Sequence, residues 1–102
     1  MVRVRVKYLG RIRELMGVRE EEYEVGDSTL EDLLMKHIPS RHGNIAGKWM
    51  RTMFQAEDRG REGIVVRSNY QIYVNGISCS MAYRLKDGDE VAILPPVGGG
   101  GG

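Results

Sequence analysis

Hydrophobic and basic residues alternate strictly from Val2 to Tyr8, which is the clearest pattern in the chain. Successive side chains of a β-strand point to opposite faces of the sheet, so this pattern predicts a strand whose valines and tyrosine are buried on one face. The opposite face of that strand carries Arg3, Arg5 and Lys7. A short helical turn is predicted at Arg11–Met16, followed by a second strand at residues 18–25 that returns beside the first.

Two later segments have apolar residues at helical spacing. The sequence Ser28-Thr29-Leu30-Glu31 fits a capping box, in which the serine hydroxyl and the glutamate carboxylate accept hydrogen bonds from backbone N–H groups at a helix start. A helix is therefore predicted from about Thr29, and Pro39 together with Gly43 is expected to end it. A second helix is predicted around Trp49, because apolar residues recur there at every fourth position.

The second half of the chain predicts further strands. After a charged loop at residues 57–63, strands are predicted at 64–66 and 70–74, and Asn75-Gly76 predicts a tight hairpin turn because both residues tolerate positive φ. Residues 91–94 are apolar throughout, which indicates a central strand that is buried on both faces. Strands at both ends with a helix between them predict a two-layer α+β fold whose terminal strands lie side by side.

Composition limits the classes of function. A chain of 102 residues, 41% hydrophobic and 28% charged, is typical of one soluble globular domain. The net charge of +1 gives no reason to expect nucleic acid or an anionic membrane as a partner. The single cysteine, Cys79, cannot form an internal disulfide, and the N-terminus lacks the apolar core of a signal peptide, so a cytoplasmic location is expected.

Side chains suited to catalysis or metal binding are scattered. His37 and His42 lie on either side of a proline and cannot share one helical face, so they are interpreted as exposed, and no metal site is predicted. Cys79 has no histidine or second cysteine nearby in the sequence and is more typical of a small core residue than of a nucleophile. The acidic groups at 20–22 and 87–90 lack the spacing of a calcium loop and are interpreted as solvated turns.

The basic row on the first strand allows two interpretations. Arg3, Arg5 and Lys7 are explained by an ordinary solvated sheet face. A second interpretation is a surface on which an acidic partner protein docks. The sequence leaves both interpretations open.

The chain ends in Pro95-Pro96-Val97 and then five glycines, Gly98, Gly99, Gly100, Gly101 and Gly102. The prolines force the chain out of the sheet, and the glycines precede no helix, which excludes a phosphate-binding loop. Fixing five glycines is entropically costly, so they add no stability, but without Cβ atoms they can enter a narrow tunnel and span roughly 17 Å. We therefore predict a domain at 1–97 and a flexible tail at 98–102 that delivers the terminal carboxylate to another enzyme.

A family resemblance supports this interpretation of the tail. Residues 85–97, which read LKDGDEVAILPPV, resemble the end of MoaD-type sulfur carriers, and Ile12–Gly17 resembles the early segment of the same family. Residues 40–63 are the weak part of the likeness. The family, which includes ThiS, ubiquitin-related modifiers and small archaeal modifier proteins, has the ubiquitin-like β-grasp fold. The resemblance thus implies a mixed sheet packed against a helix.

The resemblance also implies a chemistry for the tail. A ubiquitin-activating-like adenylating enzyme would use ATP to activate the carboxylate of Gly102, and sulfur would then replace AMP to give a thiocarboxylate. In MoaD-like proteins the tail enters the large subunit of molybdopterin synthase and donates sulfur to the precursor of the molybdenum or tungsten cofactor. By this resemblance the carrier binds no cofactor itself, Gly98–Gly101 thread the tunnel, and Pro95, Pro96 and Val97 contact the partner.

Alternatives stay open on two points. In modifier relatives the activated carboxyl is joined to a lysine of another protein, other relatives serve in tRNA thiolation, and a binding module with an inert tail is a third possibility. The family pattern needs only two glycines where this chain has five. The reactive residue is therefore Gly102 as encoded, or Gly99 after trimming.

Overall fold

A computed structural model describes residues 1–96, and Val97–Gly102 lie outside the described residues. The strands are β1 (Val2–Tyr8), β2 (Glu20–Val25), β3 (Phe54–Asp58), β4 (Ile64–Ser68), β5 (Gln71–Val74), β6 (Ile77–Ser78) and β7 (Glu90–Leu94). The helices are α1 (Arg11–Met16), α2 (Leu30–Asp32), the π-helical η1 (Leu33–His37), α3 (Ile38–Arg41), α4 (Ala46–Met53) and the single 3-10 turns η2 (Gly43–Ile45) and η3 (Gly60–Glu62). Within residues 1–96, no helix is long and apolar enough to cross a bilayer.

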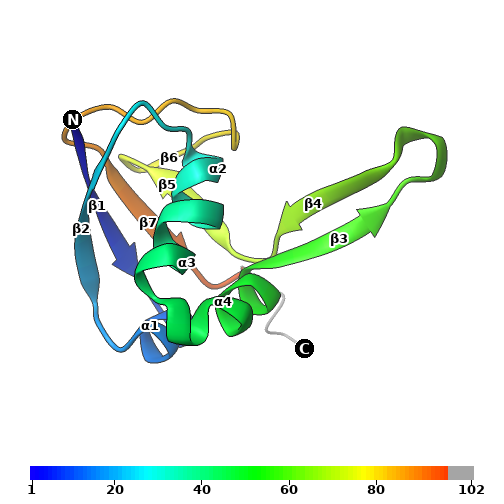
Figure 1. Cartoon of the computed structure of the whole chain (residues 1–102), viewed down its shortest axis with the longest axis horizontal. Helices are drawn as coiled ribbons and strands as arrows, with labels where there is room; N and C mark the ends of the chain where they lie inside the picture. The colour runs from blue at the N-terminus through cyan, green and yellow to red at the C-terminus, as the bar shows by residue number, and fades with distance from the viewer. Residues whose placement is uncertain (97–102) are drawn as a thin grey trace.

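The main sheet has five strands in the order β2-β1-β7-β5-β6. Strand β1 pairs antiparallel with β2 and parallel with β7, with Val6 opposite Val91 and Tyr8 opposite Ile93. The strands from the two ends of the chain therefore lie side by side, as predicted. A parallel pair requires a crossover connection, and Figure 1 shows the helices that form part of it lying across one face of the sheet. This is the layout of a β-grasp domain.

The hydrophobic core lies between this sheet and the helices. The residues that the sheet and the helices bury there are Val4, Val6, Tyr8, Val91 and Ile93 from β1 and β7, and Leu30, Leu33, Leu34 and Ile38 from α2 to α3. Strand β7 alternates in burial, with Ala92 and Leu94 only partly buried. The prediction that this strand is buried on both faces is wrong, because its outer face lies beside the half-exposed charged side chains of β1.

The long helical segment begins one residue later than predicted. Thr29 is the N-cap: its hydroxyl accepts a hydrogen bond from the Asp32 N–H at 3.1 Å, and the Asp32 carboxylate accepts one from the Thr29 N–H at 3.0 Å. Ser28 is buried instead, and its hydroxyl hydrogen-bonds to His37 Nε2 at 3.1 Å. Two overlapping capping boxes exist in the sequence, and in the folded chain the Thr29–Asp32 box forms while the Ser28 hydroxyl bonds to His37.

Pro39 does not end this segment, contrary to the prediction. Hydrogen bonding widens to the π-helical pattern over Leu33–His37, and the chain continues through Pro39 in α3. In the π pattern the N–H of residue 39 would bond to the carbonyl of Leu34, and proline has no N–H. The indole Nε1–H of the buried Trp49 donates to that carbonyl at 2.8 Å instead. A contact from α4 thus compensates for the proline.

Residues 54–68 form a second, two-stranded sheet, which we call the arm, and Figure 1 shows it extending away from the main sheet. Strands β3 and β4 pair antiparallel from Phe54 opposite Ser68 to Asp58 opposite Ile64. Part of the segment predicted as a charged loop is therefore strand. Phe54 at the base is buried, whereas Ile64 is 71% exposed near the tip.

Candidate functional site

Strand β7 fixes the point at which the C-terminal tail leaves the domain. It is hydrogen-bonded to β1 on one side and to β5 on the other, and the Leu9 N–H adds one more bond by donating to the Ile93 carbonyl at 3.1 Å. Pro95 and Pro96 follow the strand and are exposed. Proline lacks an N–H, so the strand ladder stops there as predicted. The predictions for Val97 and Gly98–Gly102 concern residues outside the described part of the chain.

Pro95 contacts two residues that are distant in the sequence. Gln71, the first residue of β5, donates from Nε2 to the Pro95 carbonyl at 3.0 Å, and its Oε1 accepts a hydrogen bond from the Tyr73 hydroxyl at 2.7 Å. Gly10 lies against the proline ring so closely that a Cβ at this position would be 2.5 Å from Pro95 Cγ. Neither Gln71 nor Gly10 is among the site residues predicted from the sequence. The available signal was a glycine two residues after the end of the first strand.

The turn that leads into β7 is organised by Asp89, which is 5% exposed. Its carboxylate accepts hydrogen bonds from the Lys86 N–H at 2.8 Å, from Asn75 Nδ2 at 2.8 Å and from the Tyr83 hydroxyl at 2.9 Å. Burial alone would raise the pKa of Asp89, but these hydrogen bonds outweigh burial and lower the pKa. The interpretation of residues 87–90 as a solvated turn is therefore wrong at Asp89.

The predicted basic row lies on the outer face of the main sheet, and each of its members faces a carboxylate. The ion pairs are Arg3 with Glu24 at 2.8 Å, Arg5 with Glu20 and with Glu22 at 3.3 Å each, and Lys7 with Glu90 at 3.4 Å. Exposed ion pairs of this kind contribute little to stability. The face therefore presents three basic side chains beside four carboxylates, and its predicted role in docking remains a prediction.

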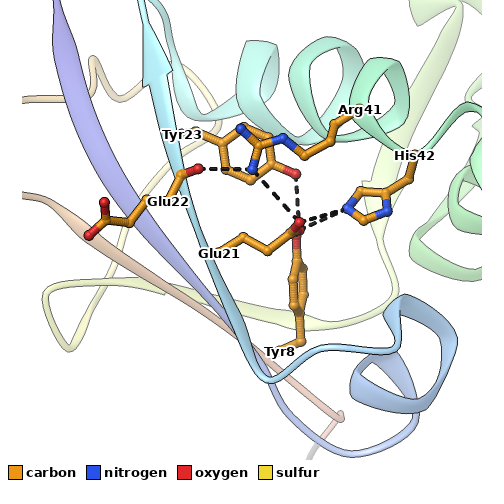
Figure 2. A network of polar contacts seen from close by, with 6 residues as sticks. All are labelled: Tyr8, Glu21, Glu22, Tyr23, Arg41 and His42. Carbon is orange, nitrogen blue, oxygen red and sulfur yellow. Dashed lines mark hydrogen bonds and ion pairs between the residues drawn. The ribbon is translucent and has the colours of Figure 1, made fainter.

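Glu21 on β2 connects the sheet to the end of α3, and Figure 2 shows the contacts. Its carboxylate accepts hydrogen bonds from the Tyr8 and Tyr23 hydroxyls at 2.7 Å and 3.2 Å, and His42 Nε2 lies 2.8 Å from its Oε1. The Arg41 guanidinium lies over the Tyr23 ring at 3.8 Å. Burial alone would raise the pKa of Glu21, but the hydrogen bonds from Tyr8 and His42 outweigh burial and lower it. Burial raises the pKa of Tyr23 to about 12.

The remaining candidate side chains differ from the sequence interpretation. Neither histidine is fully exposed, because His37 bonds to Ser28 and His42 bonds to Glu21. Cys79 is only partly buried, next to the edge strand β6, rather than in the core. Within residues 1–96, no group of three or more side chains is arranged to hold a metal ion. The candidate site is therefore the point at which the chain leaves the sheet, formed by Pro95 with Gln71 and Gly10.

Known proteins resemble this chain over nearly its whole length, the site included. Residues 6–100 match the model of the ThiS family. The chain belongs to the ThiS family. A molybdopterin synthase sulfur carrier subunit from Chlamydomonas reinhardtii is 30% identical over 99 residues, covering 97% of this chain and all of the relative.

Two solved structures resemble this ThiS-family chain over nearly its whole length. The putative molybdopterin converting factor subunit 1 from Pyrococcus furiosus has a TM-score of 0.69 and 35% identity, covering 95% of this chain and 100% of that one. The small archaeal modifier protein 1 from Methanosarcina acetivorans has a TM-score of 0.68 and 26% identity, covering 97% of each chain. These likenesses confirm the predicted α+β, ubiquitin-like β-grasp fold of this ThiS-family protein, and the family match includes the weakly resembling residues 40–63.

Proposed function

We propose that this ThiS-family protein is a sulfur carrier whose C-terminal glycine is adenylated and converted to a thiocarboxylate, and that its sulfur goes to the precursor of the molybdenum or tungsten cofactor. Its family makes it a ubiquitin-like sulfur carrier. The observation that carries the proposal is the way the chain leaves the sheet: the central strand β7 ends at Leu94 and is followed by two exposed prolines, and in the sequence one valine, Val97, then precedes the glycine run.

The proposed chemistry takes place on the chain's own carboxylate. A carboxylate oxygen of Gly102 attacks the α-phosphorus of ATP, and pyrophosphate leaves, so the glycine becomes an acyl-adenylate. A sulfide-level nucleophile, supplied by a separate enzyme, then attacks the acyl carbon, and the bond to AMP breaks. ATP belongs to the activating enzyme, and the carrier binds no cofactor of its own. Gly98–Gly101 have no Cβ atoms that would obstruct a narrow tunnel.

The proposal requires two partners in the cytoplasm. One is the adenylating enzyme, which resembles ubiquitin-activating enzymes, and the other is the large subunit of molybdopterin synthase. Pro95, Pro96 and Val97 would contact the mouth of each partner's tunnel. The curated relative that is 30% identical carries the name of a sulfur carrier subunit of that synthase, which supports the choice of the second partner.

The basic row is proposed as a second contact for a partner. Carboxylates of an acidic partner would compete with the glutamates that now pair with Arg3, Arg5 and Lys7. We expect Arg5→Glu to weaken partner binding and to reduce its dependence on salt, because one attractive charge becomes repulsive. Binding that is unchanged in both respects would leave the row as an ordinary solvated face.

A second candidate function is protein modification, in which the activated carboxyl is joined to a lysine amine. The likeness to the Methanosarcina modifier protein favours keeping this alternative. Transfer of sulfur to tRNA is a related use of the same thiocarboxylate. These uses require the same tail, so they are separated by their products.

The test of the proposal is the chemistry of the native C-terminus. We expect intact-mass and peptide mass spectrometry of protein purified from its own organism to show one oxygen exchanged for sulfur on Gly102, or on Gly99 if the last three glycines are removed. A variant without Gly101 and Gly102 should keep its melting temperature and lose activation. Lysine-linked glycine remnants on other proteins would favour the modifier, and the absence of both products would favour a binding module.

A further inference from the structure

The tail leaves the domain between a side chain of β5 and the turn after β1. We propose that Gln71 and Gly10 are positioning residues, which fix the direction in which the tail leaves the sheet and thereby preorganise it for entry into the activating enzyme. This inference rests on the proposed function and adds to it the residues that aim the tail. Neither residue would touch the reacting carboxylate.

Gln71 is held in the orientation that makes its amide a donor to Pro95. An amide side chain offers either an oxygen or an NH2 group to a neighbour. The Tyr73 hydroxyl donates to Gln71 Oε1 at 2.7 Å, and Gln71 Nε2 is then directed at the Pro95 carbonyl, 3.0 Å away. Gln71 is paired with Leu94 and Tyr73 with Ala92, so both side chains lie beside the last residues of β7.

The Pro95 carbonyl is an effective point at which to hold the tail. Its orientation is set by ψ of Pro95, and the ring of Pro96 fixes the next dihedral, φ, at about −65°. With the carbonyl held by Gln71, the first freely rotating backbone dihedral is ψ of Pro96. A single hydrogen bond to this carbonyl thus orients the chain as far as the Cα atom of Pro96.

Gly10 holds the Pro95 ring from the other side. Its backbone has φ 65° and ψ −138°, a conformation that is essentially restricted to glycine, and a Cβ there would lie 2.5 Å from Pro95 Cγ. Any other residue would have to displace the proline ring. That displacement would move the same peptide group that Gln71 holds.

A purely stabilising role makes a different prediction from a positioning role. The bond between Gln71 and Pro95 is exposed, and an exposed hydrogen bond contributes little to the stability of a fold. Loss of this bond should therefore leave the melting temperature almost unchanged. The direction of the tail should change nonetheless.

Distance distributions between two spin labels measure that direction. In a Cys79→Ser background, one label is placed at the exposed Glu31→Cys on α2 and the other at Val97→Cys, directly after Pro96. We expect a narrow distribution for the parent, and a broader one for Gln71→Leu. The matched control is Gln55→Leu on the exposed surface of the arm, which should leave the distribution unchanged.

Gly10→Ala is compared with Gly63→Ala in the same way. Gly63 has φ 84° and ψ −159°, and nothing lies within 4 Å of a Cβ built on it, so it carries a comparable backbone strain without a neighbouring proline. Both variants should lose stability. A shifted or broadened distribution is expected for Gly10→Ala alone.

Activation of the unlabelled variants completes the test. We follow pyrophosphate release from ATP with the adenylating enzyme of the same organism, and expect Gln71→Leu to raise KM for the carrier roughly two- to tenfold with kcat unchanged. Unchanged distributions for both Gln71→Leu and Gly10→Ala would overturn the inference, as would a broadened distribution with a wild-type KM. If the parent itself is not adenylated while the distributions change as expected, the fixed exit direction is supported and the proposed function fails.

Discussion

The variant Glu21→Gln removes one negative charge from the cluster in Figure 2 while keeping the size of the side chain. Two short contacts, to the Tyr8 hydroxyl at 2.7 Å and to His42 Nε2 at 2.8 Å, converge on this carboxylate. A hydrogen bond to a charged group contributes about 1.5–3 kcal/mol, and one between neutral groups about 0.5–1.5 kcal/mol. Each short contact should therefore weaken by about 1 kcal/mol, so we expect the free energy of unfolding at pH 7 to fall by about 2 kcal/mol.

Glu22→Gln is the matched control, because it makes the same chemical change on the next residue. The Glu22 side chain is 55% exposed and pairs with Arg5 on the outer face of the sheet. Such an exposed pair contributes up to about 1 kcal/mol and often less, so the control should lose little stability. Urea unfolding followed by tryptophan fluorescence measures both variants. Equal losses for the two variants would refute the role assigned to the buried cluster.

The pH dependence gives a second check on Glu21. The pKa of Glu21 is lowered in the folded protein, whereas in the unfolded chain it has the ordinary value of about 4.3. The unfolded state therefore takes up the proton first as the pH falls, and the stabilisation is complete above about 4.3 and is lost as the pH falls through the folded pKa. The difference in free energy of unfolding between the parent and Glu21→Gln should therefore narrow as the pH falls below about 5. A constant gap would show that the charge is not the cause.

Four further variants test other parts of the structure. Trp49→Ala removes a fully buried ring and the donor to the Leu34 carbonyl, so thermal unfolding should show a loss of about 3–5 kcal/mol, and a loss near zero would contradict the compensation of Pro39. Val91→Asp places an unpaired charge in the core and should abolish cooperative unfolding. A bulky residue in place of Gly101 should block activation at an unchanged melting temperature. Similar melting temperatures for these two variants would contradict the assignment of Val91 to the core and of Gly101 to the tail. Asp89→Asn should cost roughly 1–3 kcal/mol in urea unfolding because it weakens three hydrogen bonds, and an unaltered midpoint would contradict the organising role of this carboxylate.

Local patterns in the sequence predicted the elements that have strong periodicity or special turn chemistry. The alternation in Val2–Tyr8 and the hairpin turn at Asn75-Gly76 were both confirmed. Patterns that depend on a single residue were less reliable. Pro39 was wrongly expected to end a helix, because the compensating donor, Trp49, comes from a segment that the sequence does not place next to it. The end of β3 was predicted to be loop, because Glu57 and Asp58 begin a run of charged residues and glycines that contains no apolar residue.

Some residues of the candidate site were likewise predicted from the sequence, and others were not. The prolines and the glycine run are visible in the sequence, because their backbone properties are local and a family resemblance covers them. Gln71 and Gly10 were not identified, because their contact with Pro95 exists only once β5 and β7 are paired and the turn after β1 packs beside them. A polar residue in a strand has no local feature that reveals which carbonyl it will meet.

The sequence by itself determined that this protein ends in a chain segment that leaves the sheet at Pro95 and Pro96, because proline cannot continue a strand ladder whatever surrounds it. The tertiary structure alone decided where that exit lies, by pairing β7 between β1 and β5 and by bringing Gln71 and Gly10 to Pro95. These contacts join residues that are distant in the chain, and such contacts depend on strand order and register, which no local pattern specifies.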